Sequence, residues 1–162
     1  MAVVSNMQFG SHRKMKRFIT VSFLLLSLLI HYCQAELGIG LGYPYLGVKY
    51  NFSGRYSSEI KWATGDGINV YAGRGYWNFY SGEKLKGFVG PELGYITFDT
   101  LDIKGTGYEG ALFIGGECFL TKRLSLALDF SPTLIGLESD DFKVNGVEWV
   151  ANLSLYYYLW KN

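Results

Sequence analysis

Apolar residues recur at every second position along most of the chain from residue 36 onward. The first such segment alternates Leu37, Ile39 and Leu41 with glycines, and a later one alternates Leu, Leu, Leu and Phe with small or charged residues over 124–130. A period of two is typical of a β-strand, whereas a helix repeats every 3.6 residues. The pattern predicts eight strands, which begin near residues 37, 45, 55, 68, 89, 108, 123 and 147.

The two faces of these predicted strands differ in chemistry. One face carries large Leu, Ile, Trp and Tyr side chains, and the other carries Gly, Ala and Ser with isolated charges. A water-exposed face would be rich in Lys, Glu, Thr and Gln, yet residues 36–162 contain no glutamine. Small side chains suit the narrow interior of an eight-stranded barrel, so we expect the apolar face to point outward into lipid. Phe113, Ile68 and Val70 depart from this pattern, because they fall on the face of small and polar residues.

The predicted fold is all-β, an eight-stranded antiparallel up-and-down transmembrane β-barrel. Residues 36–162 number 127 (162 − 35), or about 16 for each strand with its turn. A tilted membrane-spanning strand needs about 9–11 residues, and only a closed barrel pairs all of the strand backbone inside a membrane. A secreted soluble lipocalin-like barrel is the alternative, in which the apolar face would line a cavity for apolar ligands.

The first 35 residues have a different character. Four basic residues between 13 and 17 precede an apolar run, Phe18–Ile30, and Cys33–Ala35 places small residues at its first and third positions. This order is typical of a secretory signal peptide, and the run is shorter than the roughly 20 residues that span a membrane as a helix. We therefore expect cleavage after Ala35 and export of residues 36–162 to the cell outer membrane. Met15 lies at a more usual distance from the apolar run than Met1 and is a possible true start.

The strands resemble those of the small eight-stranded outer-membrane β-barrels of the OmpA/OmpX type. The likeness is carried by Tyr45–Phe52, Gly116–Leu126 and the aromatic last segment Leu155–Trp160. It implies a monomeric integral outer-membrane protein of a diderm bacterium that contacts outer-membrane lipid and lipopolysaccharide. It also implies recognition of the last strand by the barrel-assembly machinery.

The resemblance further implies that both termini face the periplasm. The periplasmic turns would then be Asn51–Arg55, Tyr80–Lys86 and Phe119–Arg123. The outer loops would be Gly42–Tyr45, Thr64–Gly67, about 98–107 and about 133–146. Acidic residues in the two longest outer loops are candidates for contact with an unidentified surface ligand: Asp99, Asp102, Glu138, Asp140 and Asp141.

Charged residues occupy the face expected to line the barrel interior. Five are basic and six acidic, namely Lys49, Arg55, Glu59, Lys61, Arg74, Glu92, Glu109, Glu117, Arg123, Asp129 and Glu148. A buried charge without a partner is very costly, so we expect these residues to form ion pairs that plug the lumen. Glu92, for example, is expected to pair with Arg74 or Arg123. A small pore is the alternative, although a selective channel would favour charges of one sign.

Composition excludes several other functions. The formal net charge of the whole chain is +1, which offers no basic surface for nucleic acid. Both histidines, His12 and His31, precede residue 36. Related barrels that act as enzymes use a histidine to activate a nucleophile, so we expect no catalytic activity, and we expect no cofactor or metal. The role expected from sequence is structural or one of surface contact.

Overall fold

The computed structural model describes residues 36–100 and 103–160, with only the backbone described at Thr100 and Trp160. The predicted signal peptide with its cleavage site at Ala35, and the acidic residue Asp102, lie outside these residues. Within the described ranges, no helix is long and apolar enough to cross a membrane.

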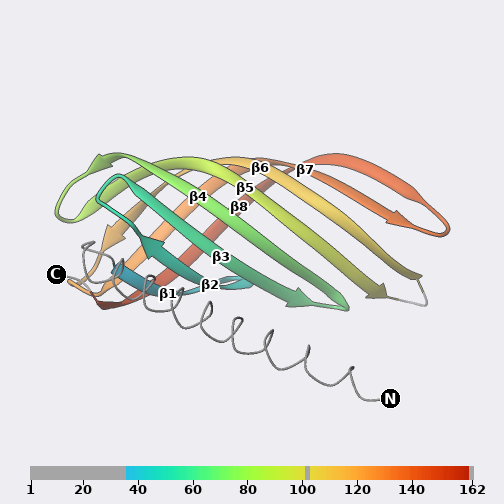
Figure 1. The fold of residues 1–162 in the computed structure, drawn as a ribbon, viewed down its shortest axis with the longest axis horizontal. Coiled ribbons are helices and arrows are strands. Elements are labelled where there is room, and N and C mark those ends of the chain that lie inside the picture. The colour runs from blue at the N-terminus through green and yellow to red at the C-terminus, as the bar shows by residue number, and fades with distance from the viewer. Residues whose placement is uncertain (1–35, 101–102, 161–162) are drawn as a thin grey trace, which may run out of the picture. The chain divides into compact units, whose positions relative to one another are not determined.

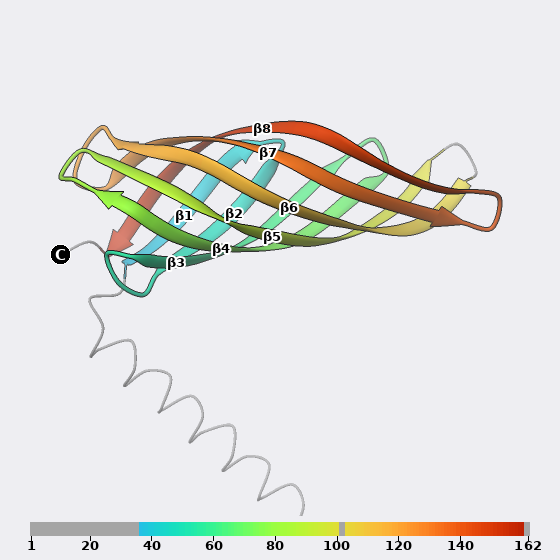
Figure 2. The same ribbon diagram turned by 90° about the horizontal axis from the view of Figure 1, so that it is seen from above.

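The described chain forms a closed antiparallel β-barrel in which each strand pairs with the next and the last pairs with the first. This arrangement confirms the predicted all-β class, strand number and up-and-down order. Figures 1 and 2 show the eight strands side by side around the barrel. Their bounds are β1 Glu36–Tyr43, β2 Tyr45–Asn51, β3 Tyr56–Gly65, β4 Ile68–Ser81, β5 Leu85–Thr100, β6 Ile103–Phe119, β7 Leu124–Ser139 and β8 Lys143–Trp160.

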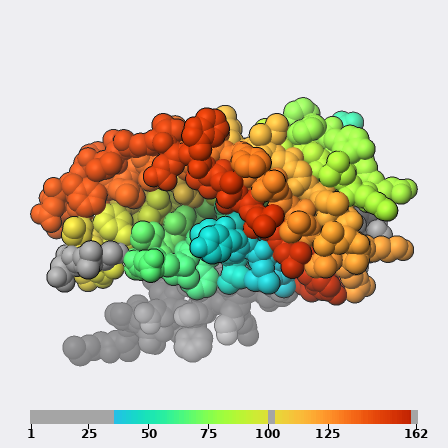
Figure 3. Space-filling view, turned by 180° about the vertical axis from the view of Figure 1, so that it is seen from behind, coloured from blue at the N-terminus to red at the C-terminus, as the bar shows by residue number. Residues whose placement is uncertain are grey.

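The wall of the barrel is much taller on one side than on the other. Strands β1, β2 and β3 have 8, 7 and 10 residues, whereas β5 to β8 have 16 to 18. We call the end with the turns after β1, β3, β5 and β7 the upper end, and the opposite end the lower end. The β7–β8 hairpin, orange to red in Figure 3, extends well past the cyan β1–β2 hairpin at the upper end.

The two segments expected to be long outer loops are strands in the structure. Strands β5 and β6 continue to Thr100 and from Ile103, and β7 and β8 continue to Ser139 and from Lys143. Glycines interrupt the alternation here, but a large side chain on the neighbouring strand covers each of two of them. A Cβ added at Gly105 would overlap the Phe98 ring, and one at Gly107 would lie 2.6 Å from Leu137. The alternation did not predict these strand segments, because the apolar side chains that cover the glycines come from a neighbouring strand and not from the same strand.

The barrel is apolar outside and holds buried charged side chains inside. Outward-facing side chains such as Ile60 are exposed (73%), whereas inward-facing Arg74 is 3% exposed. This distribution matches the facing expected from the alternation. Phe113 is fully buried inside the barrel, and Val70 lines a cavity in it, so the departures at these two positions are confirmed. Ile68 lies at the exposed upper end of β4.

Large aromatic side chains fill the lower part of the interior. Tyr76, Phe88 and Phe113 pack together with ring centroids 4.9–6.0 Å apart, and Tyr156 and Tyr158 of β8 are equally buried. The adjacent β1 makes room for the tyrosines with glycines. A Cβ added at Gly40 would lie 2.5 Å from the ring of Tyr156, so this close approach requires glycine at that position.

Candidate functional site in the charged interior

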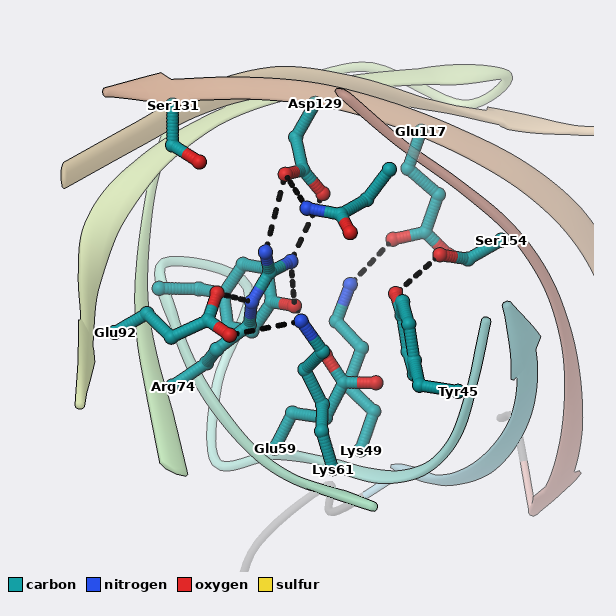
Figure 4. A network of polar contacts seen from close by, with 12 residues as sticks. Tyr45, Lys49, Glu59, Lys61, Arg74, Glu92, Glu117, Asp129, Ser131 and Ser154 are labelled. Atoms are coloured by element: carbon teal, nitrogen blue, oxygen red, sulfur yellow. Dashed lines mark hydrogen bonds and ion pairs between the residues drawn. The ribbon is translucent and has the colours of Figure 1, made fainter. Parts of the chain in front are cut away.

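Seven of the eleven charged residues predicted for the lumen are buried inside the barrel. They come from β2 to β7, and each occupies an inward position in the alternation of its strand. The three cations and four carboxylates buried in the described part of the chain are Lys49, Lys61, Arg74, Glu59, Glu92, Glu117 and Asp129. Figure 4 shows these side chains converging on one another across the lumen.

Arg74 is the centre of the largest polar network. Its two terminal nitrogens donate hydrogen bonds to the two carboxylate oxygens of Asp129, at 2.8 and 3.1 Å, and its Nε donates to Glu92. Glu92 also accepts a hydrogen bond from the Lys61 Nζ at 2.8 Å, and Asp129 accepts one from Asn152 at 2.9 Å. The planar guanidinium therefore joins strands on opposite sides of the barrel through ion pairs of fixed geometry.

A second network surrounds Lys49. Its Nζ donates to Glu117 at 2.8 Å, and it also lies 4.5 Å from the centre of the Tyr76 ring. The other oxygen of the Glu117 carboxylate accepts hydrogen bonds from Ser125 at 2.5 Å and from Tyr158 at 2.6 Å. The carboxylate is thus fully engaged, as a buried charge must be.

Glu59 is held by tyrosines rather than by a cation. Its two oxygens accept hydrogen bonds from Tyr76 and, at 2.8 Å, from Tyr156. In the residues described here, no ion pair to the Glu59 carboxylate is found within 4 Å. The Arg74 guanidinium lies 3.4 Å from the Tyr76 hydroxyl, and this contact connects Glu59 to the Arg74 network.

We expect Tyr156→Phe to lower the free energy of unfolding by about 1.5–3 kcal/mol, because it removes one of two donors to a buried carboxylate. Urea unfolding of the folded barrel, followed by tryptophan fluorescence, would measure this change. Tyr157→Phe is the matched control, since Tyr157 is the next residue but points outward and is 46% exposed. Equal stability of the two variants would contradict the role assigned to the Tyr156 hydroxyl.

Four of the predicted lumen charges lie outside these networks. Arg55 and Arg123 are exposed in turns at the lower end, and Glu148 is exposed near the upper end of β8. Glu109 is half-buried and points into the lumen but belongs to no network. Glu92 therefore pairs with Arg74 and not with Arg123. Alternation along a strand shows which face a charge occupies, but it does not show how close the charge lies to the open end of the barrel.

The acidic residues predicted to contact a surface ligand differ in whether a lysine neutralises them. Asp99 pairs with Lys104 at 2.8 Å and Glu138 pairs with Lys143 at 3.0 Å, all four side chains being well exposed. The hydrogen bond and the charge of Asp99 raise the pKa of Lys104. Asp140 and Asp141 lie in the turn between β7 and β8. The acidic surface expected at this end is thus partly neutralised by lysines.

Sequence reasoning missed the neutral side chains that complete the networks. They are Tyr45, Tyr76, Tyr156, Tyr158, Ser125, Ser154 and Asn152. Each occupies an inward position, so the alternation itself was the available signal. The tyrosines were overlooked because a tyrosine side chain is as compatible with an apolar outer face as with a polar interior.

Two comparisons with known proteins identified no relative of this chain. No protein-family model matches the sequence, and no curated protein matches it. Within the described ranges, no group of three or more His, Cys, Asp or Glu side chains is placed to hold a metal ion. The fold and the interior together define the class of the molecule: a closed eight-stranded antiparallel barrel with an apolar exterior and buried charge pairs inside.

Proposed function

We propose that the protein is an integral outer-membrane β-barrel without catalytic activity, whose lumen is closed by its paired charges. The observation that carries this proposal is the distribution of side chains. Large apolar residues cover the outside of every strand, while lysine, arginine and carboxylate groups are buried within. A soluble barrel has the reverse arrangement, and a membrane is the solvent in which this exterior is favourable.

The same distribution argues against the two alternatives. A lipocalin-like binder of apolar ligands needs an apolar interior, whereas Lys49, Arg74 and Glu117 lie at the centre of this one. An open pore needs a continuous aqueous path, and the ion pair between Arg74 and Asp129 crosses the lumen from β4 to β7. We therefore favour a structural or surface-contact role. The tall wall of β5 to β8 would supply the contact surface.

The test is to express the full chain in a diderm bacterium, isolate the outer-membrane fraction and run it on a gel with and without boiling. We expect a membrane-embedded band whose mobility shifts on heating, because a closed barrel resists detergent until it is heated. Leu26→Arg, in the predicted apolar core of the signal peptide, is the control and should prevent export. A soluble periplasmic band with no heat shift would overturn the proposal. Large stable conductance in a planar bilayer would overturn the closed lumen while keeping the membrane barrel.

A further inference from the structure

The lumen contains an unfilled space above the Arg74 network. A cavity of about 160 Å³ lies there, and its wall contains both apolar and polar side chains. Val70, Ile135 and Val150 contribute apolar surface, while Lys61, Glu109 and Thr133 contribute polar groups. We call this space the mouth cavity. An apolar pocket with a few placed polar groups is the usual form of a small-molecule site.

Glu109 is the unmatched charge of the mouth cavity. The cavity wall includes one lysine and two glutamates, and Lys61 is already paired with Glu92 at 2.8 Å. The half-buried carboxylate of Glu109 accepts no hydrogen bond and forms no ion pair with any residue that the structure describes. Every fully buried carboxylate of the interior has such partners, so Glu109 differs from all of them.

Glycines next to Glu109 shape the wall on which it lies. Gly94 is its cross-strand partner on β5, and a Cβ added there would lie 2.5 Å from the Glu109 carboxylate. The carboxylate is thus folded across β5 along the barrel wall. Ile135 is its partner on β7 and is followed across the sheet by Gly146 on β8, where an added Cβ would meet nothing within 4 Å. Open space therefore lies beside Ile135, on the side away from Glu109.

We propose that the mouth cavity binds a small amphipathic cation. Its ammonium group pairs with Glu109, and its ring or short chain packs on Val70, Ile135 and Val150. The size is suitable, because a cavity of about 150 Å³ accommodates benzene. The charge selects the ligand class: an anion would meet Glu109 and Glu92, and a neutral ligand would leave Glu109 without a counterion. This site is independent of whether the barrel lies in a membrane.

The test is calorimetric titration of the folded full barrel with benzylamine at neutral pH, where the amine is charged. Two further probes separate the contributions: benzyl alcohol has the ring without the charge, and ammonium chloride has the charge without the ring. We expect benzylamine to bind and the other two to bind at least about tenfold more weakly. Absence of benzylamine binding, or equal binding of benzyl alcohol, would overturn the proposal.

Two variants locate the site. Glu109→Gln should weaken benzylamine binding by at least about tenfold, since it removes the negative charge that pairs with the ammonium group. Glu138→Gln is the matched control, because Glu138 is exposed, points outward on the neighbouring β7 and lies outside the cavity. Val150→Trp, which fills the cavity with a larger apolar side chain, should abolish binding while the heat-shifted gel band shows that the barrel is folded. Unchanged affinity in Glu109→Gln or in Val150→Trp would place the amine elsewhere and contradict the assignment.

Discussion

Arg74→Ala is expected to lower the free energy of unfolding by about 3–5 kcal/mol, the usual cost of removing one partner of a buried ion pair. The Arg74 side chain is buried, and it donates to both Glu92 and Asp129. Without it, Lys61 alone opposes Glu92, and Asp129 keeps only its hydrogen bond from Asn152. The loss of stability arises mainly because the buried Asp129 carboxylate no longer has a cation beside it, and only in smaller part from lost packing of the Arg74 side chain.

Urea unfolding in lipid vesicles measures this effect, with two variants for comparison. Arg74→Lys keeps the charge but loses the paired contact of two nitrogens with Asp129, so its stability should lie between the wild type and Arg74→Ala. Arg123→Ala removes the same side chain from an exposed turn, and its effect should be about 0–1 kcal/mol. A loss below that of Arg123→Ala would mean that the Arg74 network does not stabilise the barrel.

Leu128→Lys is expected to destabilise the barrel in lipid by about 2–4 kcal/mol, as a lysine does on the lipid face near the bilayer midplane. Leu128 points outward next to Asp129, at the level of the Arg74 network, and is 45% exposed. In water the same change would replace an exposed apolar side chain by a charged one at little cost. The size of the loss therefore reports the surroundings of the barrel wall.

Leu120→Lys is the matched control for this prediction. Leu120 is 58% exposed, but it lies in the turn between β6 and β7, where a lysine would reach the aqueous interface at a cost of about 0–1 kcal/mol. Both variants are compared by unfolding in vesicles after folding is verified by the heat-shifted gel band. If Leu128→Lys is as stable as Leu120→Lys, the outward face does not contact lipid.

The alternation of residues within each strand was sufficient to predict the barrel, but it did not predict the lengths of the strands. The inward position of Arg74 and the burial of Phe113 follow from a period of two, which each strand carries in its own sequence. The tall wall was missed over 98–107 and 133–146, since glycines such as Gly105 interrupt the alternation and are covered by side chains of a neighbouring strand. Strand length there depends on cross-strand packing, which no single segment encodes.

The sequence by itself determined the all-β class, the strand number and the inward position of the seven buried charges. All three depend on the order of residues within one strand, because successive side chains of a strand point to opposite faces. Only the tertiary structure decided which charges meet. Arg74 and Asp129 are 55 residues apart in the chain, and they pair because closure of the barrel brings β4 and β7 to face each other across a narrow lumen. Closure of the barrel also leaves Glu109 without an ion pair among the described residues. How far Glu109 lies from each cation depends on the register between strands, which only the closed barrel defines.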